Sequence, residues 1–447
     1  MVPKKYFTSL PLLLITFLLP SLCAPTLLSA MPPIQRLVLS NHLTLLHAEE
    51  HSLPFVTMQI LVEAGSRIDP PGKEGLAHLV ARGLLLGSSR HTITALNEEL
   101  DFMGASLNSS CGRDYATLNL RVLKKDLDKG VDLFFETLTQ PTFPQEEIGR
   151  EIERTLAGIQ AAEEQPDEVA DKAFQTSLFL SSPYGHPVVG TEESLPRLTR
   201  EEVGQFYRHF YHPYHSILTV VGDITLEELK AKLLPRLAEW PEGKGLEPPF
   251  KTSFTKEKKT VKINRDITQA NIILGHAGVS RENRDFYALT VMNYIFGGGG
   301  FSSRLVEEIR NKRGLAYSVA SFFDPGKYPG SFQIVLQTKN ASAREAISLS
   351  LKQMERIRQE PVSEQELEGA KKYLIGSFPM RLDTQGKLAN FLTQVEYFGL
   401  GLDYPEKFST FIRSVTREDV LRVAKIYLHP DIYILVVVAN LKEAGME

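Results

Sequence analysis

The sequence predicts an α+β protein made of two homologous halves, each with an antiparallel or mixed sheet that carries helices on one face. Three observations indicate this fold class. Similar segments recur along the chain, strand-like segments are grouped with long amphipathic helices, and a stretch rich in proline and glycine separates the two copies. Hydrophobic residues make up 43% of the 447 residues, which is enough to form a large core.

The internal repeat rests on three pairs of similar segments. His212-Pro213 and His429-Pro430 each stand between a helix end and an apolar run typical of a strand. In the second pair a strand is followed by Ala-Gly, and in the third a proline and an acidic start precede an amphipathic helix. These two pairs are 56–67 with 270–281, and 139–159 with 358–378.

The first thirty residues have the layout of a secretory signal. Lys4 and Lys5 precede an apolar run from Leu10 to Leu22, and small residues follow. The run is too short, and too often interrupted by proline, for a comfortable membrane span. We therefore predict a signal peptide over residues 1–30 and an exported protein, periplasmic or extracellular, which stays tethered to the membrane if the segment is not cleaved.

The remaining boundaries follow from composition and periodicity. Residues 241–255 are rich in proline, glycine and charge, as linkers are, so we predict one domain over 33–240 and a second over 256–447. The clearest elements are strands at 116–123 and 331–338, a helix at 125–140, and a strand–turn–strand unit over 35–47.

Charge and hydropathy exclude two classes of partner. The formal net charge is −4 with no long block of one sign, whereas nucleic-acid binding needs a clustered basic face. No second apolar stretch approaches the length of a membrane span. We therefore expect no nucleic-acid partner, and no membrane contact beyond the N-terminal segment.

The stretch His47-Ala48-Glu49-Glu50-His51 has the form H-x-x-E-H, the inverted pattern of some zinc peptidases. Pro54 follows closely and would end a helix, so we interpret the stretch as an exposed acidic turn between strands. Residues four apart on a turn do not share a helical face, so their side chains would not converge on one ion. The alternative is an active zinc endopeptidase that uses His47, Glu50 and His51.

A second region, residues 63–90, resembles the signature region of the pitrilysin/insulinase family of zinc peptidases, which includes the mitochondrial processing peptidase. The matching motifs are Ala64-Gly65-Ser66-Arg67, Pro70-Pro71-Gly72-Lys73 and Gly75-Leu76-Ala77-His78. In that family an H-x-x-E-H helix begins at the position of His78. The resemblance covers about residues 33 to 440 and implies the processing-peptidase-like metallohydrolase fold.

The family's zinc residues are largely missing here. The position of the glutamate base is Ala81, the position of the second histidine is Arg82, and Ala157 and Gly158 stand where the third ligand is expected. One imidazole does not hold zinc against water, and an arginine repels a cation. Without a carboxylate at position 81, nothing takes a proton from a metal-bound water. We therefore expect no metal site in this chain.

The second half keeps its own signature. Residues 296–319 resemble the family's C-terminal-half motif, in which an arginine and a tyrosine seven positions apart assist catalysis at a zinc site held elsewhere. Arg310 and Tyr317 have that spacing. We expect a helix that runs to about Arg313 and ends at a C-cap glycine, Gly314, with Tyr317 in the following strand. Such donors suit the oxyanion of a tetrahedral intermediate, although a basic helix end and a packed tyrosine would be the purely structural interpretation.

The glycine stretch before that helix is a candidate substrate contact. It lacks the G-K-[S/T] ending of a phosphate-binding loop, and glycine loops more often let backbones approach or move. In the mitochondrial relatives a similar loop touches substrate. The predicted substrate-binding residues are Gly297, Gly298, Gly299 and Gly300.

The resemblance implies a zinc-less subunit of a two-chain metallopeptidase that acts on peptides or unfolded proteins. Zinc is then expected in the partner, a homologous subunit with an intact H-x-x-E-H, and Arg310 and Tyr317 would act in trans. Two alternatives stay open: a non-catalytic scaffold or peptide-binding protein of the same fold, and an active zinc endopeptidase with an atypical site.

Overall fold

The computed structural model describes residues 31–180, 182–238, 240–243 and 252–447. The predicted signal peptide, 1–30, and most of the predicted linker lie outside the described residues. Within the described ranges no helix is both long and apolar enough to cross a membrane.

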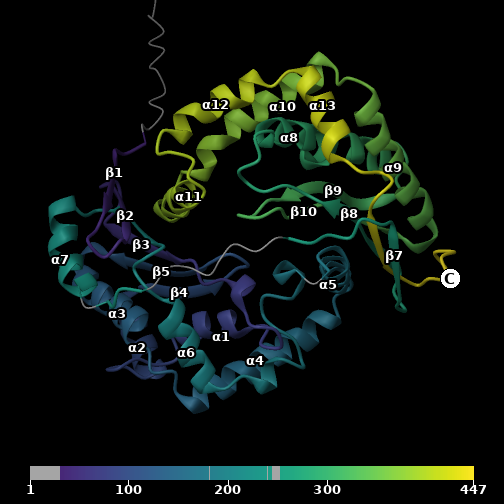
Figure 1. Ribbon diagram of the computed structural model, residues 1–447. Helices are drawn as coiled ribbons and strands as arrows, with labels where there is room; N and C mark the ends of the chain where they lie inside the picture. Colours follow the sequence, from purple (N-terminus) through teal and green to yellow (C-terminus); the bar gives the residue numbers. More distant parts are fainter. Residues whose placement is uncertain (1–30, 181, 239, 244–251) are drawn as a thin grey trace, which may run out of the picture.

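Two sheets, one in each half, form the frame of the molecule (Figure 1). The first sheet has the strand order β1 (Ile34–Val38), β2 (Thr44–Glu49), β6 (Ser216–Gly222), β3 (Phe55–Val62), β5 (Ala116–Leu123), β4 (Ser106–Cys111). The second has the order β7 (Lys259–Asn264), β11 (Ile434–Ala439), β8 (Gln269–Ala277), β10 (Ser331–Lys339), β9 (Ala316–Asp324).

The two sheets have the same topology apart from β1. The only parallel contacts between the described strands are β2 with β6 and, in the second half, β7 with β11. All the other pairs are antiparallel. The repeat predicted from the sequence is therefore present as two mixed sheets with matching strand orders, and the predicted α+β class is confirmed.

The helices include the one predicted over 125–140, which is α3 (Leu127–Thr139). The first half contains α1 (Leu76–Gly83), α2 (Ile93–Met103), α3 (Leu127–Thr139), α4 (Gln145–Glu163), α5 (Pro166–Leu178), α6 (Arg200–Phe210) and α7 (Leu226–Ala238). The second contains α8 (Phe286–Asn293), α9 (Ala343–Gln359), α10 (Glu364–Ser377), α11 (Gln385–Tyr397), α12 (Tyr404–Ser414) and α13 (Arg417–Tyr427). Capping boxes begin α6, α10 and α13, where a Ser or Thr and an acidic side chain three residues later satisfy the first backbone N–H groups.

One helix of each half crosses to the sheet of the other half. Helix α5 packs on β8 and β11, where Phe174 lies fully buried against the second sheet. Helix α11 packs on β3 and β6 through Leu388 and Leu392 (Figure 1). Each sheet thus has its own helices on one face, as predicted, and a helix from the other half on the opposite face, which the repeat alone did not predict.

A buried polar cluster joins the halves beside these helices. The Lys327 Nζ lies 2.7 Å from Glu63 Oε2, and the Lys327 backbone N–H donates to Asp114 at 3.1 Å. The Tyr184 hydroxyl also donates to Asp114, at 2.5 Å. Because Glu63 and Asp114 are nearly inaccessible to solvent, these contacts hold the two halves in one relative position.

Candidate functional site

Helix α1 places the degenerate zinc motif. The Asp69 carboxylate accepts hydrogen bonds from the N–H groups of Gly75 and Ala77, at 2.8 and 2.7 Å, and so fixes the start of the helix. Burial raises the pKa of Asp69 to about 7 in spite of these donors. Along the helix, His78 is half-buried and Ala81 is fully buried.

An ion pair occupies the motif in place of metal ligands. The Arg82 Nε donates to Glu151 Oε1 at 3.0 Å, and Arg154 Nη1 lies 3.0 Å from Glu151 Oε2. Glu151 belongs to α4, and its side chain is only 3% exposed, whereas that of Arg82 is 36% exposed. Burial lowers the pKa of His78, and the charge of Arg82 lowers it further, so the imidazole is neutral.

These residues do not fit a zinc ion. Ala81 has no donor atom, Gly158 has no side chain, and the guanidinium of Arg82 carries a fixed positive charge beside His78. In the part of the chain that the structure describes, no group of three or more His, Cys, Asp or Glu side chains could hold a metal ion. The first half therefore lacks both a ligand set and a general base at this position.

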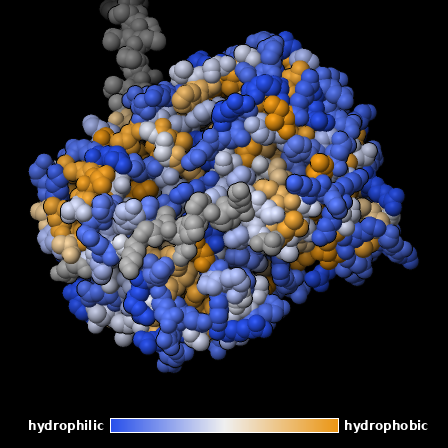
Figure 2. Space-filling view, viewed as in Figure 1, coloured by the Kyte–Doolittle hydropathy of each residue, from blue (hydrophilic) through white to orange (hydrophobic). Residues whose placement is uncertain are grey.

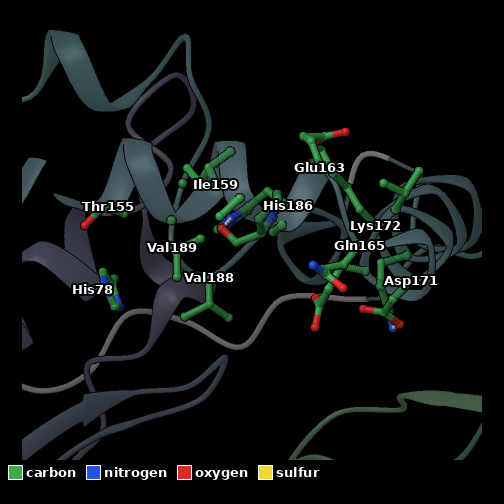
Figure 3. A pocket seen from close by; sticks show the side chains of 18 of the residues that line it. His78, Thr155, Ile159, Glu163, Gln165, Asp171, Lys172, His186, Val188 and Val189 are labelled. Atoms are coloured by element: carbon green, nitrogen blue, oxygen red, sulfur yellow. Dashed lines mark hydrogen bonds and ion pairs between the residues drawn. The ribbon is translucent and has the colours of Figure 1, made fainter. Parts of the chain in front are cut away.

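A cavity of about 760 Å³ opens beside the motif. Figure 3 shows His78 and Thr155 near one end and the Glu163–Lys172 pair near the other, with His186 between them. Ile159, Val188 and Val189 give the middle of the cavity an apolar lining. A space of this size and composition suits an extended peptide or an apolar side chain.

The second half brings Arg310 and Tyr317 together, as predicted. The helical segment turns into a π-helix over Val306–Asn311, so it ends two residues before the predicted Arg313. Gly314 has φ of +63°, and its N–H donates to the Arg310 carbonyl at 2.9 Å, as expected of a C-cap glycine. Tyr317 follows in β9, so the predicted helix-to-strand corner is present.

The guanidinium of Arg310 lies over aromatic rings. Its Cζ is 5.8 Å from the centroid of Tyr317 and 4.9 Å from that of Phe301. Both rings are exposed, at 73% for Tyr317 and 71% for Phe301. Arg310 makes no ion pair with any residue that the structure describes. Its N–H groups are therefore open to a ligand.

The glycine stretch is not the open loop that the sequence indicated. Gly297 and Gly298 belong to a π-helical turn, Tyr294–Gly298, that continues α8. A Cβ at Gly297 would lie 2.4 Å from Ser321 Oγ, so glycine is needed there for close packing rather than for motion. Beyond this turn Gly299 is half-buried, and Gly300 is exposed with φ of +56°. Their contact with substrate stays a prediction.

The H-x-x-E-H stretch at His47 differs from the predicted turn. His47 and Glu49 lie in β2, and only Glu50 and His51 lie in the turn after it. His47 is fully buried, and its Nε2 lies 2.9 Å from the Ile224 carbonyl. His51 is exposed and forms hydrogen bonds with Glu49 through its Nε2 and with Asp223 through its Nδ1. The two histidines therefore occupy different environments, and no shared ion site forms.

Two residues of the site were not predicted. Glu151 carries a signal that could have been used, because a half-buried arginine on one helix is commonly paired with an acid on the facing helix. It lies on α4 seven residues before Gly158. Phe301 directly follows the glycine stretch, but nothing in the local sequence indicates that its ring meets Arg310.

Comparisons with known proteins agree with these observations. Residues 44–192 match the family model "Insulinase (Peptidase family M16)", and residues 197–374 match the model "Peptidase M16 inactive domain". The described fold is also similar to the crystal structure of a peptidase M16 inactive domain from Pseudomonas fluorescens. The TM-score is 0.86 and the identity 26%, over 91% of this chain and 98% of that chain.

Relatives of known sequence carry two kinds of name. An uncharacterized zinc protease of Rickettsia bellii is 28% identical over 86% of this chain and 93% of its own length. A non-peptidase homolog, YmxG, of Helicobacter pylori is 26% identical over 89% of this chain and 92% of its own length. The similarity thus extends over nearly the whole of these proteins.

Proposed function

Since this chain belongs to peptidase family M16 and its first half does not fit a zinc ion, we propose that it is the zinc-less subunit of a two-chain metallopeptidase. In this proposal it supplies substrate binding and transition-state stabilisation in trans. The observation that carries the proposal is the contrast between two sites. Arg82 and Glu151 close the metal position with an ion pair, while Arg310 stays beside the exposed ring of Tyr317 without an acid partner among the described residues.

The chemistry of Arg310 and Tyr317 suits a peptide carbonyl. Arg310 offers N–H donors with a permanent charge, and Tyr317 offers a hydroxyl from the adjacent strand. Donors held in advance at the place where negative charge develops stabilise the tetrahedral oxyanion more than the planar carbonyl. The rate therefore gains from this chain, while the metal and the general base belong to the other subunit.

The proposed partner is a homologous chain with an intact H-x-x-E-H helix, and the proposed substrates are peptides or unfolded proteins. The basic start and apolar run of residues 4–22 support a further proposal, that the complex works outside the cytoplasm. A fusion of residues 1–30 to alkaline phosphatase, which is active only after export, tests the location.

The test of function is reconstitution. The chain is co-expressed with a homologue from the same genome that has an intact zinc motif, and the purified complex is assayed with a quenched-fluorescent unstructured peptide. We expect neither chain to cleave the peptide at the rate of the complex. Arg310→Ala and Tyr317→Phe in the complex should each lower kcat by about 10²–10³, the usual loss for one oxyanion donor.

A matched control lies just beyond the end of the same helical segment. Arg313 is also cationic, but its Nη1 is paired with Glu308 at 2.8 Å, so Arg313→Ala should leave kcat unchanged. Cleavage by this chain alone with bound zinc would overturn the proposal. Equal rates for Arg310→Ala, Tyr317→Phe and the wild-type complex would overturn it as well.

A second candidate function is peptide binding without catalysis, and the cavity beside His78 favours it. In that case the isolated chain binds unstructured peptides, and Val189→Trp, which fills the cavity, abolishes the binding. Fluorescence anisotropy with a labelled peptide measures this directly. Binding that is unaffected by Val189→Trp would exclude the cavity as the peptide site.

A further inference from the structure

We infer that Phe301 is a positioning residue of the trans-acting site, and that its ring, together with that of Tyr317, holds the Arg310 guanidinium in place. This inference rests on the proposed function. It adds a third residue to the site and explains why a large apolar side chain is exposed at the end of the glycine stretch. The distance from the Arg310 Cζ to the ring of Phe301, 4.9 Å, is shorter than the distance to Tyr317, 5.8 Å.

The backbone around Phe301 is rigid although its ring is exposed. The residue lies in a 3₁₀ turn, Gly300–Ser302. Ser303 donates to the Gly300 carbonyl through both its N–H, at 3.0 Å, and its hydroxyl, at 2.7 Å, and Ser303 is fully buried. The Ser302 hydroxyl donates to the Gly299 carbonyl at 2.8 Å. These hydrogen bonds therefore fix the backbone from which the ring of Phe301 projects.

Arg310 differs from the two neighbouring cations, because they are paired with an acid and Arg310 is not. Lys312 Nζ lies 2.5 Å from Glu308 Oε1, and Arg313 Nη1 lies 2.8 Å from Glu308 Oε2. Among the described residues, Arg310 has only aromatic partners. Two of the three cations thus share the carboxylate of Glu308, and the third has no acid partner among the described residues.

An aromatic partner suits a catalytic cation better than a carboxylate would. A ring face attracts the guanidinium without accepting its N–H hydrogen bonds, so the donors at the edge stay available to a carbonyl oxygen. A carboxylate would occupy those donors and cancel the charge. With two rings beside it, the guanidinium is restricted before substrate arrives, which lowers the entropy cost of the transition-state contact.

The experiment uses the reconstituted two-chain complex and the quenched-fluorescent peptide. Phe301→Ala should lower kcat by between about twofold and thirtyfold, the range that cation–π contacts span from exposed to desolvated sites, with KM unchanged. Phe301→Tyr keeps a ring face and should restore the rate. Phe301→Ala combined with Arg310→Ala should be no slower than Arg310→Ala alone, because the ring acts only through the guanidinium.

The matched control is Phe102→Ala, which removes a ring that is 93% exposed on α2; it should leave kcat unchanged. A wild-type kcat for Phe301→Ala, in a complex that Arg310→Ala impairs, would overturn the inference and leave the proposed function standing. A loss confined to KM, or weaker association of the chains in sedimentation velocity, would also overturn it, because Phe301 would then contact substrate or partner. If Arg310→Ala itself retains full activity, the proposed function fails and the inference fails with it.

Discussion

Removing the arginine that closes the degenerate motif should destabilise the first half of the protein. Arg82→Ala deletes the guanidinium 3.0 Å from Glu151 and leaves a carboxylate that is 3% exposed. Loss of one partner of a buried ion pair costs about 3–5 kcal/mol, because an uncompensated charge stays out of water. Here Arg154 remains 3.0 Å away, so we expect a smaller loss, about 2–3 kcal/mol.

Removing the acid instead of the arginine should cost less stability, and this difference makes the prediction specific. Glu151→Ala leaves Arg82 without its acid, but that side chain is already 36% exposed and can be hydrated. We expect about 1 kcal/mol for Glu151→Ala, and a double variant that is more stable than Arg82→Ala alone.

Differential scanning calorimetry measures the effect. For a domain of 150–250 residues each kcal/mol shifts Tm by about 2–4 °C, so Arg82→Ala should lower the Tm of the first half by about 5–10 °C. The control is Arg150→Ala on α4, the helix that carries Glu151; its pairs with Glu146 and Glu147 lie at the surface and should contribute about 0.5 kcal/mol. Equal shifts for Arg82→Ala and Arg150→Ala would refute the claim that a buried ion pair closes the motif.

Three further predictions concern the second half and its contact with the first. Burial opposes ionisation of Glu366, but the hydrogen bonds from Arg304 and Ser363 and the charge of Arg304 together outweigh it and lower its pKa from 4.5 to about 2. Glu366→Gln should therefore lower Tm at neutral pH. The difference from wild type should shrink as pH falls from 4.5 towards 2, because the ionised carboxylate gives its full stabilisation above pH 4.5 and loses it as it is protonated. Lys327→Met removes the 2.7 Å contact with Glu63, and hydrogen exchange in α5 and α11 should quicken by about tenfold to a hundredfold, as expected for a lost charge-assisted hydrogen bond. Gly297→Ala places a Cβ 2.4 Å from Ser321 Oγ. It should lower the free energy of unfolding by about 1–3 kcal/mol, as measured by thermal unfolding.

Much of the fold follows from local sequence patterns. The alternation at 116–123 and 331–338 predicts β5 and β10 because strands with a buried face have a period of two. The repeat predicts two sheets because each copy has the same succession of strand and helix signals. The crossing of α5 and α11 is not predictable in this way, because a helix with an apolar face can pack on either sheet, and only the assembled halves decide which.

The candidate sites also differ in whether local sequence patterns predict them. The pairing of Arg310 with Tyr317 depends on a spacing of seven residues and a C-cap glycine, both readable in sequence. The ion pair of Arg82 with Glu151 joins residues 69 apart, and the burial of His47 depends on strand β6 and the segment after it. Such contacts between distant segments need the tertiary structure, and for this reason the turn predicted from His47 was placed too early: it begins only at Glu50.

The different contributions of Arg82 and Arg310 to folding support the proposal that two chains form the active peptidase together. Arg82 stabilises the fold, because without it a buried acid loses its nearest cation. Arg310 contributes little to folding: its charge has no acid partner among the described residues, and both rings beside it face solvent. A chain that needed only to fold could exchange Arg310 for a neutral side chain at almost no cost, whereas it could not exchange Arg82 alone. The order around Arg310 is therefore best explained by what the arginine binds, and in the proposed two-chain complex this ligand is the carbonyl group of the reacting peptide.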